Sequence, residues 1–247
     1  MDEEKKGIGT RFQDETKYLR DGMKVYSSDV FERAEQYKHY PDATKVLPLP
    51  PVRPEGQAGF WDTIINRRSQ RDFTKEPLAL DELALLIFAT QGITEKWGDT
   101  MFRAAPSAGA LYPIETYIHA NRVTGLDCGI YHLNTARQAL EFIRPGDCSP
   151  SLAIAALGQD MVRDSAAVFL WTAIPGRSTW KYHERAYRYI YLDAGHIGQN
   201  LCLAATALGL GCCTIGAFFD TEVNEIIGID GQNETAVYLG VIGTVQE

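Results

Sequence analysis

The sequence predicts an α+β protein with one globular domain. A chain of 247 residues, 45% of them hydrophobic, is long enough to close a core without metals or cross-links. Segments with helical spacing and segments rich in β-branched and aromatic residues alternate irregularly along it. A doubly wound sheet needs regular alternation of strands and helices, so this order favours α+β. No repeat with a period of roughly 20 to 50 residues is visible.

The chain divides into an N-terminal arm, residues 1–56, and a main domain, residues 57–247. Four prolines lie between positions 47 and 54. Because proline donates no hydrogen bond to a helix or a strand ladder, this run predicts an extended spacer. We expect the arm to pack on the main domain or on a partner subunit.

Helices are expected at three places in the main domain. Residues 60–66 place four apolar side chains at helical spacing and lead into a cationic loop. Asp81 is the expected cap of a second helix, which Gly92 ends. The third helix, from about 185 to 208, has little polar surface, so we expect it to be buried nearly all round, at the centre of a dimer. We expect His196, on this helix, to be a hydrogen-bonded core residue.

Four segments are predicted strands because β-branched and aromatic residues are frequent in them. They are residues 116–120, 166–174, 212–215 and 236–242. Cys212 and Cys213 fall in the third strand. We expect them to be small strand residues, with a redox role as the less favoured alternative.

Composition limits the partners and the compartment. A formal net charge of −8 leaves no sequence-wide basic face, so small molecules are favoured over nucleic acid and anionic membranes. Five cysteines form an odd set without a C-x-x-C pair, and the first residues lack the apolar core of a signal peptide. No apolar run reaches the roughly 20 residues of a membrane span. These features predict a cytoplasmic protein.

Several sources of chemistry are absent from the sequence. The dinucleotide fingerprint G-x-G-x-x-G lacks its third glycine after Gly211, and no P-loop motif occurs. The five histidines lie far apart and form no H-E-x-x-H, so no metal site is expected. Ser107 lacks the preceding glycine of a hydrolase nucleophile elbow. A bound organic cofactor is therefore the favoured source of chemistry.

Two segments remain as candidate cofactor sites. Residues 67–71 place three guanidinium groups and a hydroxyl close together, which suits a phosphate dianion. The alternative is a solvated basic loop that balances an acidic protein. Residues 104–115 form a loop of small residues whose backbone a flat ligand can approach closely. The alternative there is an ordinary connecting turn.

These segments carry a resemblance to a known family. The runs R-R-S-x-R-x-F at 67–73, P-S-A-G-A-L-Y-P-I-E at 106–115 and G-L-G-C-C-T-I-G-A-F-F-D at 209–220 have the order and spacing of the nitroreductase superfamily. A fourth stretch, within 181–201, resembles the branch that contains azoline dehydrogenases of the streptolysin type. The resemblance covers about residues 57–245.

The resemblance implies a nitroreductase-like fold, with a central mixed or antiparallel sheet flanked by helices, in an intertwined homodimer. It implies FMN at the subunit interface. The implied cofactor-binding residues form three groups: Arg67, Arg68, Ser69 and Arg71 at the phosphate and the pyrimidine edge; Pro106, Ser107 and Ala108 of the other subunit against the isoalloxazine; and Ile215, Gly216 and Ala217 with a backbone N–H toward flavin N5.

One departure concerns the phosphate site. Many relatives end with a basic motif that completes it, whereas residues 243–247 contain none. Arg185 or Arg188 could take that role. The alternative is that both are ion-pair partners of nearby acids such as Glu184 and Asp193.

Lys181 and Tyr182 are the expected catalytic residues. In azoline dehydrogenases a Lys-Tyr pair at this place is implicated in removing the proton that accompanies hydride loss to FMN. The alternative is a surface lysine beside a packing tyrosine.

The sequence thus predicts an FMN-dependent oxidoreductase. Hydride is expected to pass from NADH or NADPH through FMN N5 to a nitroaromatic, quinone or similar electron-poor acceptor, with ping-pong kinetics. One alternative is an azoline-type dehydrogenase that oxidises a heterocycle with FMN. Another is a non-catalytic flavin-binding or storage protein.

Overall fold

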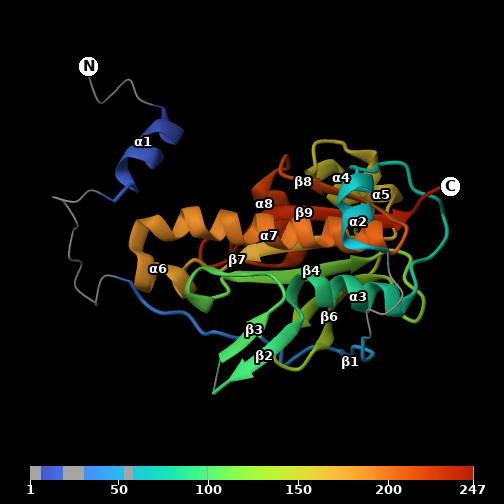
Figure 1. The fold of residues 1–247 in the computed structure, drawn as a ribbon, viewed down its shortest axis with the longest axis horizontal. Helices are drawn as coiled ribbons and strands as arrows, with labels where there is room; N and C mark the ends of the chain where they lie inside the picture. The colour runs from blue at the N-terminus through green and yellow to red at the C-terminus, as the bar shows by residue number, and fades with distance from the viewer. Residues whose placement is uncertain (1–6, 19–30, 53–57, 99, 247) are drawn as a thin grey trace.

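The structure is a computed structural model that describes residues 7–18, 31–52, 58–98 and 100–246 (Figure 1). Its centre is a seven-stranded sheet in the order β1-β6-β5-β4-β7-β9-β8, in which every neighbouring pair is antiparallel. The strands are β1 (Lys45–Pro48), β4 (Ile114–Ala120), β5 (Gly129–Asn134), β6 (Ala139–Pro145), β7 (Ala167–Ala173), β8 (Leu210–Ile215) and β9 (Thr235–Thr244). The predicted α+β class, with helices flanking the sheet, is confirmed.

Helices cover both faces of this sheet. One core forms with α3 (Leu80–Gln91) and α7 (Ala186–Ala207), and a second with α4 (Ser149–Ala155), α5 (Asp160–Asp164) and α8 (Asp220–Ile227). Alternation along the strands produces the two cores: in β7, Phe169 and Trp171 belong to the first, and Val168 and Leu170 to the second. Figure 1 shows α7 running along the sheet, with α2 (Phe60–Asn66) beside its C-terminal part.

The remaining elements are short. They are the hairpin β2 (Ile93–Trp97) and β3 (Thr100–Arg103), the 3₁₀ turns η2 (Ala108–Ala110) and η3 (His183–Arg185), α6 (Gly176–Tyr182), and α1 (Ile8–Glu15). α6 leads through η3 directly into α7. In the described part of the chain no helix is both long enough and apolar enough to cross a membrane.

The expected helices and strands are found, with one change of cap. α3 begins at Leu80, before Asp81. The cap contact comes instead from Glu82, whose side chain accepts a hydrogen bond of 2.8 Å from the N–H of Ala79. Gly92 ends the helix as expected.

The long helix α7 has one exposed side. Tyr191 and Leu192 are 56% and 58% exposed, so the expectation of burial nearly all round is wrong for the chain on its own. His196 is also exposed, and is not a core residue. We call the exposed apolar side chains of α2 and α7 the apolar face: Phe60, Trp61, Ile64, Ile65, Tyr191 and Leu192.

The N-terminal arm contributes a strand. β1 is the edge strand of the sheet and pairs with β6, so the proline run begins inside a strand. An edge strand tolerates Pro48 because one side of its ladder has no neighbour. Positions 53 and 54 of the expected spacer lie outside the described residues.

Candidate functional site

The loop before β4 is held by Asp193 of α7. The hydroxyl of Ser107 donates a hydrogen bond of 2.5 Å to Oδ2 of Asp193, and the N–H of Ala108 donates one of 3.3 Å to Oδ1. Ser107 Oγ in turn accepts a bond of 2.9 Å from the N–H of Tyr112. Burial raises the pKa of the Asp193 carboxyl, and the two donors offset this only in part. The segment predicted to face the flavin is thereby fixed to the longest helix.

The same loop has an unusual backbone conformation. Gly109, Ala110 and Tyr112 have φ of 64°, 54° and 46°, in the left-handed region that non-glycine residues rarely adopt. Such residues persist where the surroundings determine them, as they do at many functional sites. Here Arg177 donates a hydrogen bond of 3.2 Å to the carbonyl of Tyr112, and the N–H of Arg103 donates one of 3.1 Å to the Tyr112 hydroxyl.

The two expected catalytic residues meet at Gly109. A Cβ added there would lie 2.5 Å from the hydroxyl oxygen of Tyr182 and 2.8 Å from Nζ of Lys181. Both polar groups therefore lie directly over the glycine, which leaves no room for a side chain. α6 presents this pair, and the chain then turns sharply at His183, where φ is 51°.

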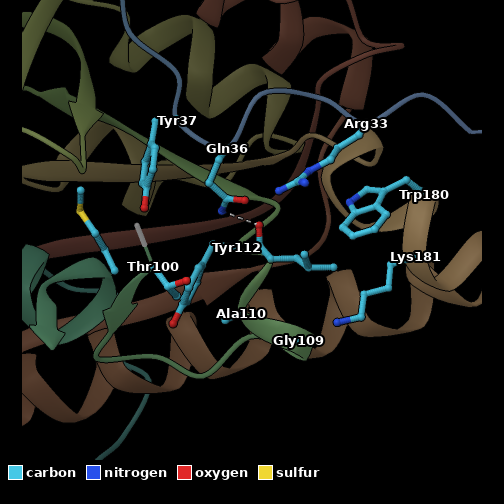
Figure 2. Close-up of a pocket in the computed structure, with 11 residues that line it drawn as sticks. Arg33, Gln36, Tyr37, Thr100, Gly109, Ala110, Tyr112, Trp180 and Lys181 are labelled. Atoms are coloured by element: carbon cyan, nitrogen blue, oxygen red, sulfur yellow. Dashed lines mark hydrogen bonds between the residues drawn. The ribbon is translucent and has the colours of Figure 1, made fainter. Parts of the chain in front are cut away.

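A cavity of about 400 Å³ opens beside this point (Figure 2). Its walls come from the arm, from the start of β3, from residues 109–112 and from α6. Arg33 and Lys181 are its charged lining residues. Figure 2 shows both extending into it from the same side, with Trp180 between them.

A buried polar network underlies the cavity. Glu115 forms an ion pair of 2.5 Å with Arg177 and lies 2.9 Å from Nε2 of His132, whose Nδ1 lies 2.9 Å from Glu141. Burial alone would raise the pKa of Glu115, but the charge of Arg177 and the hydrogen bond with His132 lower it to about 2. Arg177 also donates 2.6 Å to the carbonyl of Glu35. The network thus joins the arm, β4 and α6.

The arginine loop forms a second group. The N–H of Gln70 donates a hydrogen bond of 2.9 Å to the carbonyl of Cys212, which ties the loop to β8. In the described part of the chain, the side chains of Arg67, Ser69 and Arg71 have no hydrogen bond or ion pair, so their donors are available to an anion. Arg68 differs, because its guanidinium donates to the carbonyls of residues 65 and 67, at 3.0 and 2.8 Å.

The turn after β8 completes this second group. Ile215 is the last residue of β8 and is buried, while Gly216 and Ala217 are exposed beyond it. Cys212 and Cys213 are strand residues, as expected. The sulfur of Cys212 lies 3.4 Å from that of Cys202 on α7, which brings two thiols together in the core under the loop.

The single chain keeps the two groups apart. Pro106, Ser107 and Ala108 are attached to α7 at Asp193, whereas the arginine loop lies on β8 near Cys202, nine residues further along the helix. Among the described residues no hydrogen bond or ion pair joins the groups.

Arg185 and Arg188 have other partners than those expected. Arg188 donates to Thr16 Oγ1 and to the carbonyl of Gln13, both at 2.7 Å, and Arg185 donates 3.0 Å to the carbonyl of Thr16. Neither forms an ion pair with Glu184 or Asp193 among the described residues. Both arginines therefore anchor the segment around α1.

One group of potential metal ligands is present elsewhere. His119, Cys128 and Asp147 each place a ligand atom within 4.8 Å of the others. Two of them are already engaged, because His119 Nε2 accepts a bond of 2.9 Å from the N–H of Cys148, and Asp147 accepts one of 2.8 Å from the N–H of Ser149.

Sequence patterns did not indicate the roles of two residues of this site. Asp193 was expected only as an ion-pair partner, yet it holds a loop 86 residues away. Arg33 lies in the arm, far in sequence from every motif. A cationic residue among other charged residues does not indicate a cavity. The spacing of residues in the sequence therefore could not predict either role.

The chain is similar to proteins of one family. A family model described as the nitroreductase family matches residues 64–244. MJ1384 of Methanocaldococcus jannaschii, which bears a provisional nitroreductase name, is 39% identical over 168 residues, or 68% of this chain and 83% of that protein. The microcin B17-processing protein McbC of Escherichia coli is 27% identical over 151 residues, or 59% of this chain and 55% of McbC.

A solved structure agrees with these matches. A crystal structure from Anabaena variabilis, also named provisionally as a nitroreductase, has a TM-score of 0.71 at 32% identity. The match covers 96% of this chain and 47% of that one, so this chain spans about half the length of that protein. The nitroreductase-like fold implied by the motifs is confirmed.

Proposed function

This chain belongs to the nitroreductase family, and from that premise we propose that it is an FMN-dependent oxidoreductase. The observation that carries the proposal is the free donor set of the arginine loop. Arg67, Ser69 and Arg71 offer two guanidiniums and a hydroxyl to an anion, and Gln70 ties them to β8. That donor set fits a phosphate group. When bound, FMN accepts and returns hydride at N5.

Each group of residues has a part in this proposal. Arg67 and Arg71 hold the phosphate by charge-assisted hydrogen bonds, and Arg68 shapes the loop by capping the end of α2. The exposed turn at Gly216 and Ala217 offers backbone N–H groups to the flavin edge. Asp193 keeps the loop of Ser107 rigid, so that the flavin meets a preorganised surface.

We propose hydride transfer from NADH or NADPH to an electron-poor acceptor such as a nitroaromatic or a quinone. Donor and acceptor use one pocket in turn, which gives ping-pong kinetics. Steady-state rates at several fixed acceptor concentrations test this directly. Parallel double-reciprocal lines are expected, and intersecting lines would contradict a shared pocket.

The functional unit in this proposal is a homodimer. Four large apolar side chains of the apolar face lie on α2, and two of them, Trp61 and Ile65, are 72% and 64% exposed. Exposed apolar surface of this kind is typical of an interface. A partner would cover it and bring its own residues 106–108 to the arginine loop. Sedimentation of Trp61→Glu tests this: a monomer that has lost FMN is expected. Trp97→Glu, at 78% exposure in the β2–β3 hairpin, is the matched control and should remain a dimer.

A second candidate is oxidation of a heterocycle, as in azoline dehydrogenases. The meeting of Lys181 and Tyr182 over Gly109 favours it, because an amine and a hydroxyl at one point can remove and pass on a substrate proton. McbC, a microcin B17-processing protein, is among the relatives. Lys181→Ala separates the candidates: lost dehydrogenation with intact nitroaromatic reduction supports the second.

A further inference from the structure

The cavity beside Gly109 has a charge opposite to that of the whole chain. The chain has a formal net charge of −8, yet the charged lining residues are two cations, Arg33 and Lys181. Among the described residues neither cation forms an ion pair. Two neighbouring cations without a counterion repel each other, and a bound anion relieves that repulsion.

A neighbouring ring orients one of the two cations. The guanidinium of Arg33 lies 4.8 Å from the ring centroid of Trp180, a cation–π contact that orients it. Nζ of Lys181 lies over Gly109. Figure 2 shows the two side chains directed into the same space. The cavity therefore presents two cations to a ligand, and Trp180 orients one of them.

The remaining walls favour a planar ligand. Tyr37, Tyr112 and Trp180 supply aromatic surface. The side chain of Gln36 donates a hydrogen bond of 2.9 Å to the carbonyl of Leu111, which fixes the arm to the loop. A volume of about 400 Å³ is within the range of small-molecule sites.

We propose that this cavity binds an aromatic acid, a planar conjugated ring with one carboxylate, and that Arg33 is the residue that selects the charge. The inference rests on the proposed function, because the cavity adjoins the loop that would face the flavin, and it names the class of the acceptor. Arg33 holds the carboxylate from the arm, while the amine of Lys181 stays near the reacting end of the ring.

Paired probes test the charge selection. The dissociation constants of 4-nitrobenzoate and of its neutral analogue 4-nitrobenzamide are measured by calorimetry on the purified full chain with its flavin, without an electron donor. We expect the acid to bind about tenfold more tightly, the effect of one charge-assisted hydrogen bond. Added salt should weaken the binding of the acid and leave the binding of the amide unchanged.

Variants of Arg33 test whether this residue causes the preference for the acid. Arg33→Gln should remove the preference for the acid, and Arg33→Lys should keep most of it. The control is Arg137→Gln, which removes an exposed arginine from the turn between β5 and β6 and should change neither constant. Equal affinities for the two probes, or a preference that survives in Arg33→Gln, would overturn the proposal.

One further outcome reassigns the cations. If Arg33→Gln slows flavin reduction by NADPH but not by NADH, and leaves 4-nitrobenzoate binding intact, the cavity serves the phosphate of the donor and the proposal is overturned. Failure of the proposed function has a separate signature. A protein that takes up no flavin but still prefers the acid contradicts the FMN assignment and not the charge selection.

Discussion

Ser107 and Asp193 are 86 residues apart in sequence, and a hydrogen bond of 2.5 Å joins their side chains. If this bond fixes the loop, Ser107→Ala and Asp193→Asn should each lower the free energy of unfolding by about 1 to 2 kcal/mol. The double variant should lose less than the sum, because both changes remove the same contact. Urea unfolding of the four proteins measures this, and strictly additive losses would show that the bond is energetically unimportant.

Gly109→Ala should damage activity more than stability. The new Cβ would collide with the Tyr182 hydroxyl and Lys181 Nζ, and displacement of reacting groups by about 1 Å can cost about 100-fold in rate. Gly158→Ala is the matched control, because Gly158 has φ +75° with nothing within 4 Å of a Cβ. Both variants should lose about 1 kcal/mol of stability from the strained backbone. Turnover that falls equally in both would contradict the steric role of Gly109.

Elements with a uniform pattern could be predicted from the sequence, and elements that bury polar groups could not. β7 and β9 are apolar on both faces and were expected. β5 and β6 were missed because they carry His132 and Glu141, whose polar side chains break the hydrophobic pattern. In the fold these side chains are satisfied by each other, by Glu115, by Asn134 and by the N–H of Tyr40. β1 was missed because Pro48 argues against a strand, except at an edge.

The same distinction holds for the site. The motifs at Arg67, Ser107 and Lys181 are local in sequence, so the resemblance they carry could be recognised, and it is confirmed for the family and for the branch that includes azoline dehydrogenases. The contacts of Asp193 and Arg33 join segments distant in sequence. Only the fold brings such residues together, so their contacts could not be predicted from the spacing of residues in the sequence.

Arg67 and Arg68 should differ in their effect on FMN. Arg67→Gln removes a free donor, so FMN affinity should fall at least about tenfold, as for a lost charge-assisted hydrogen bond. Arg68→Gln removes contacts to the carbonyls of residues 65 and 67 instead, so it should affect stability more than affinity. Titration of flavin fluorescence measures both constants. A fully flavinated Arg67→Gln protein, or equal losses in the two variants, would refute the assignment.

Stability in acid should depend on Glu115. Its pKa in the folded protein is lowered from 4.5 to about 2, so folding favours the charged form. The resulting stability is present above pH 4.5 and is lost as the pH falls toward 2, on the order of 3 kcal/mol in total. Glu115→Gln should flatten this part of the pH profile in urea unfolding. If Glu115→Gln loses stability in acid as the unchanged protein does, other carboxyl groups cause that loss.

His132 should contribute stability that is lost at the opposite, alkaline end of the pH range. Burial lowers its pKa, but the hydrogen bonds to Glu115 and Glu141 outweigh burial and raise it above 6.5. Its contribution is therefore present below pH 6.5 and is lost as the pH rises through the raised pKa. Urea unfolding should show a plateau of stability between the loss in acid and the loss at alkaline pH. In His132→Gln the loss at alkaline pH should disappear.

The proposed function requires that this chain binds FMN and uses it. The most direct measurement is the visible absorption spectrum of the purified protein after incubation with FMN, followed by anaerobic addition of NADH and then of NADPH. We expect the two bands of bound oxidised flavin and their bleaching by at least one donor. Bands that persist with both donors would favour heterocycle oxidation or flavin storage. A protein that takes up no flavin would contradict the proposed function.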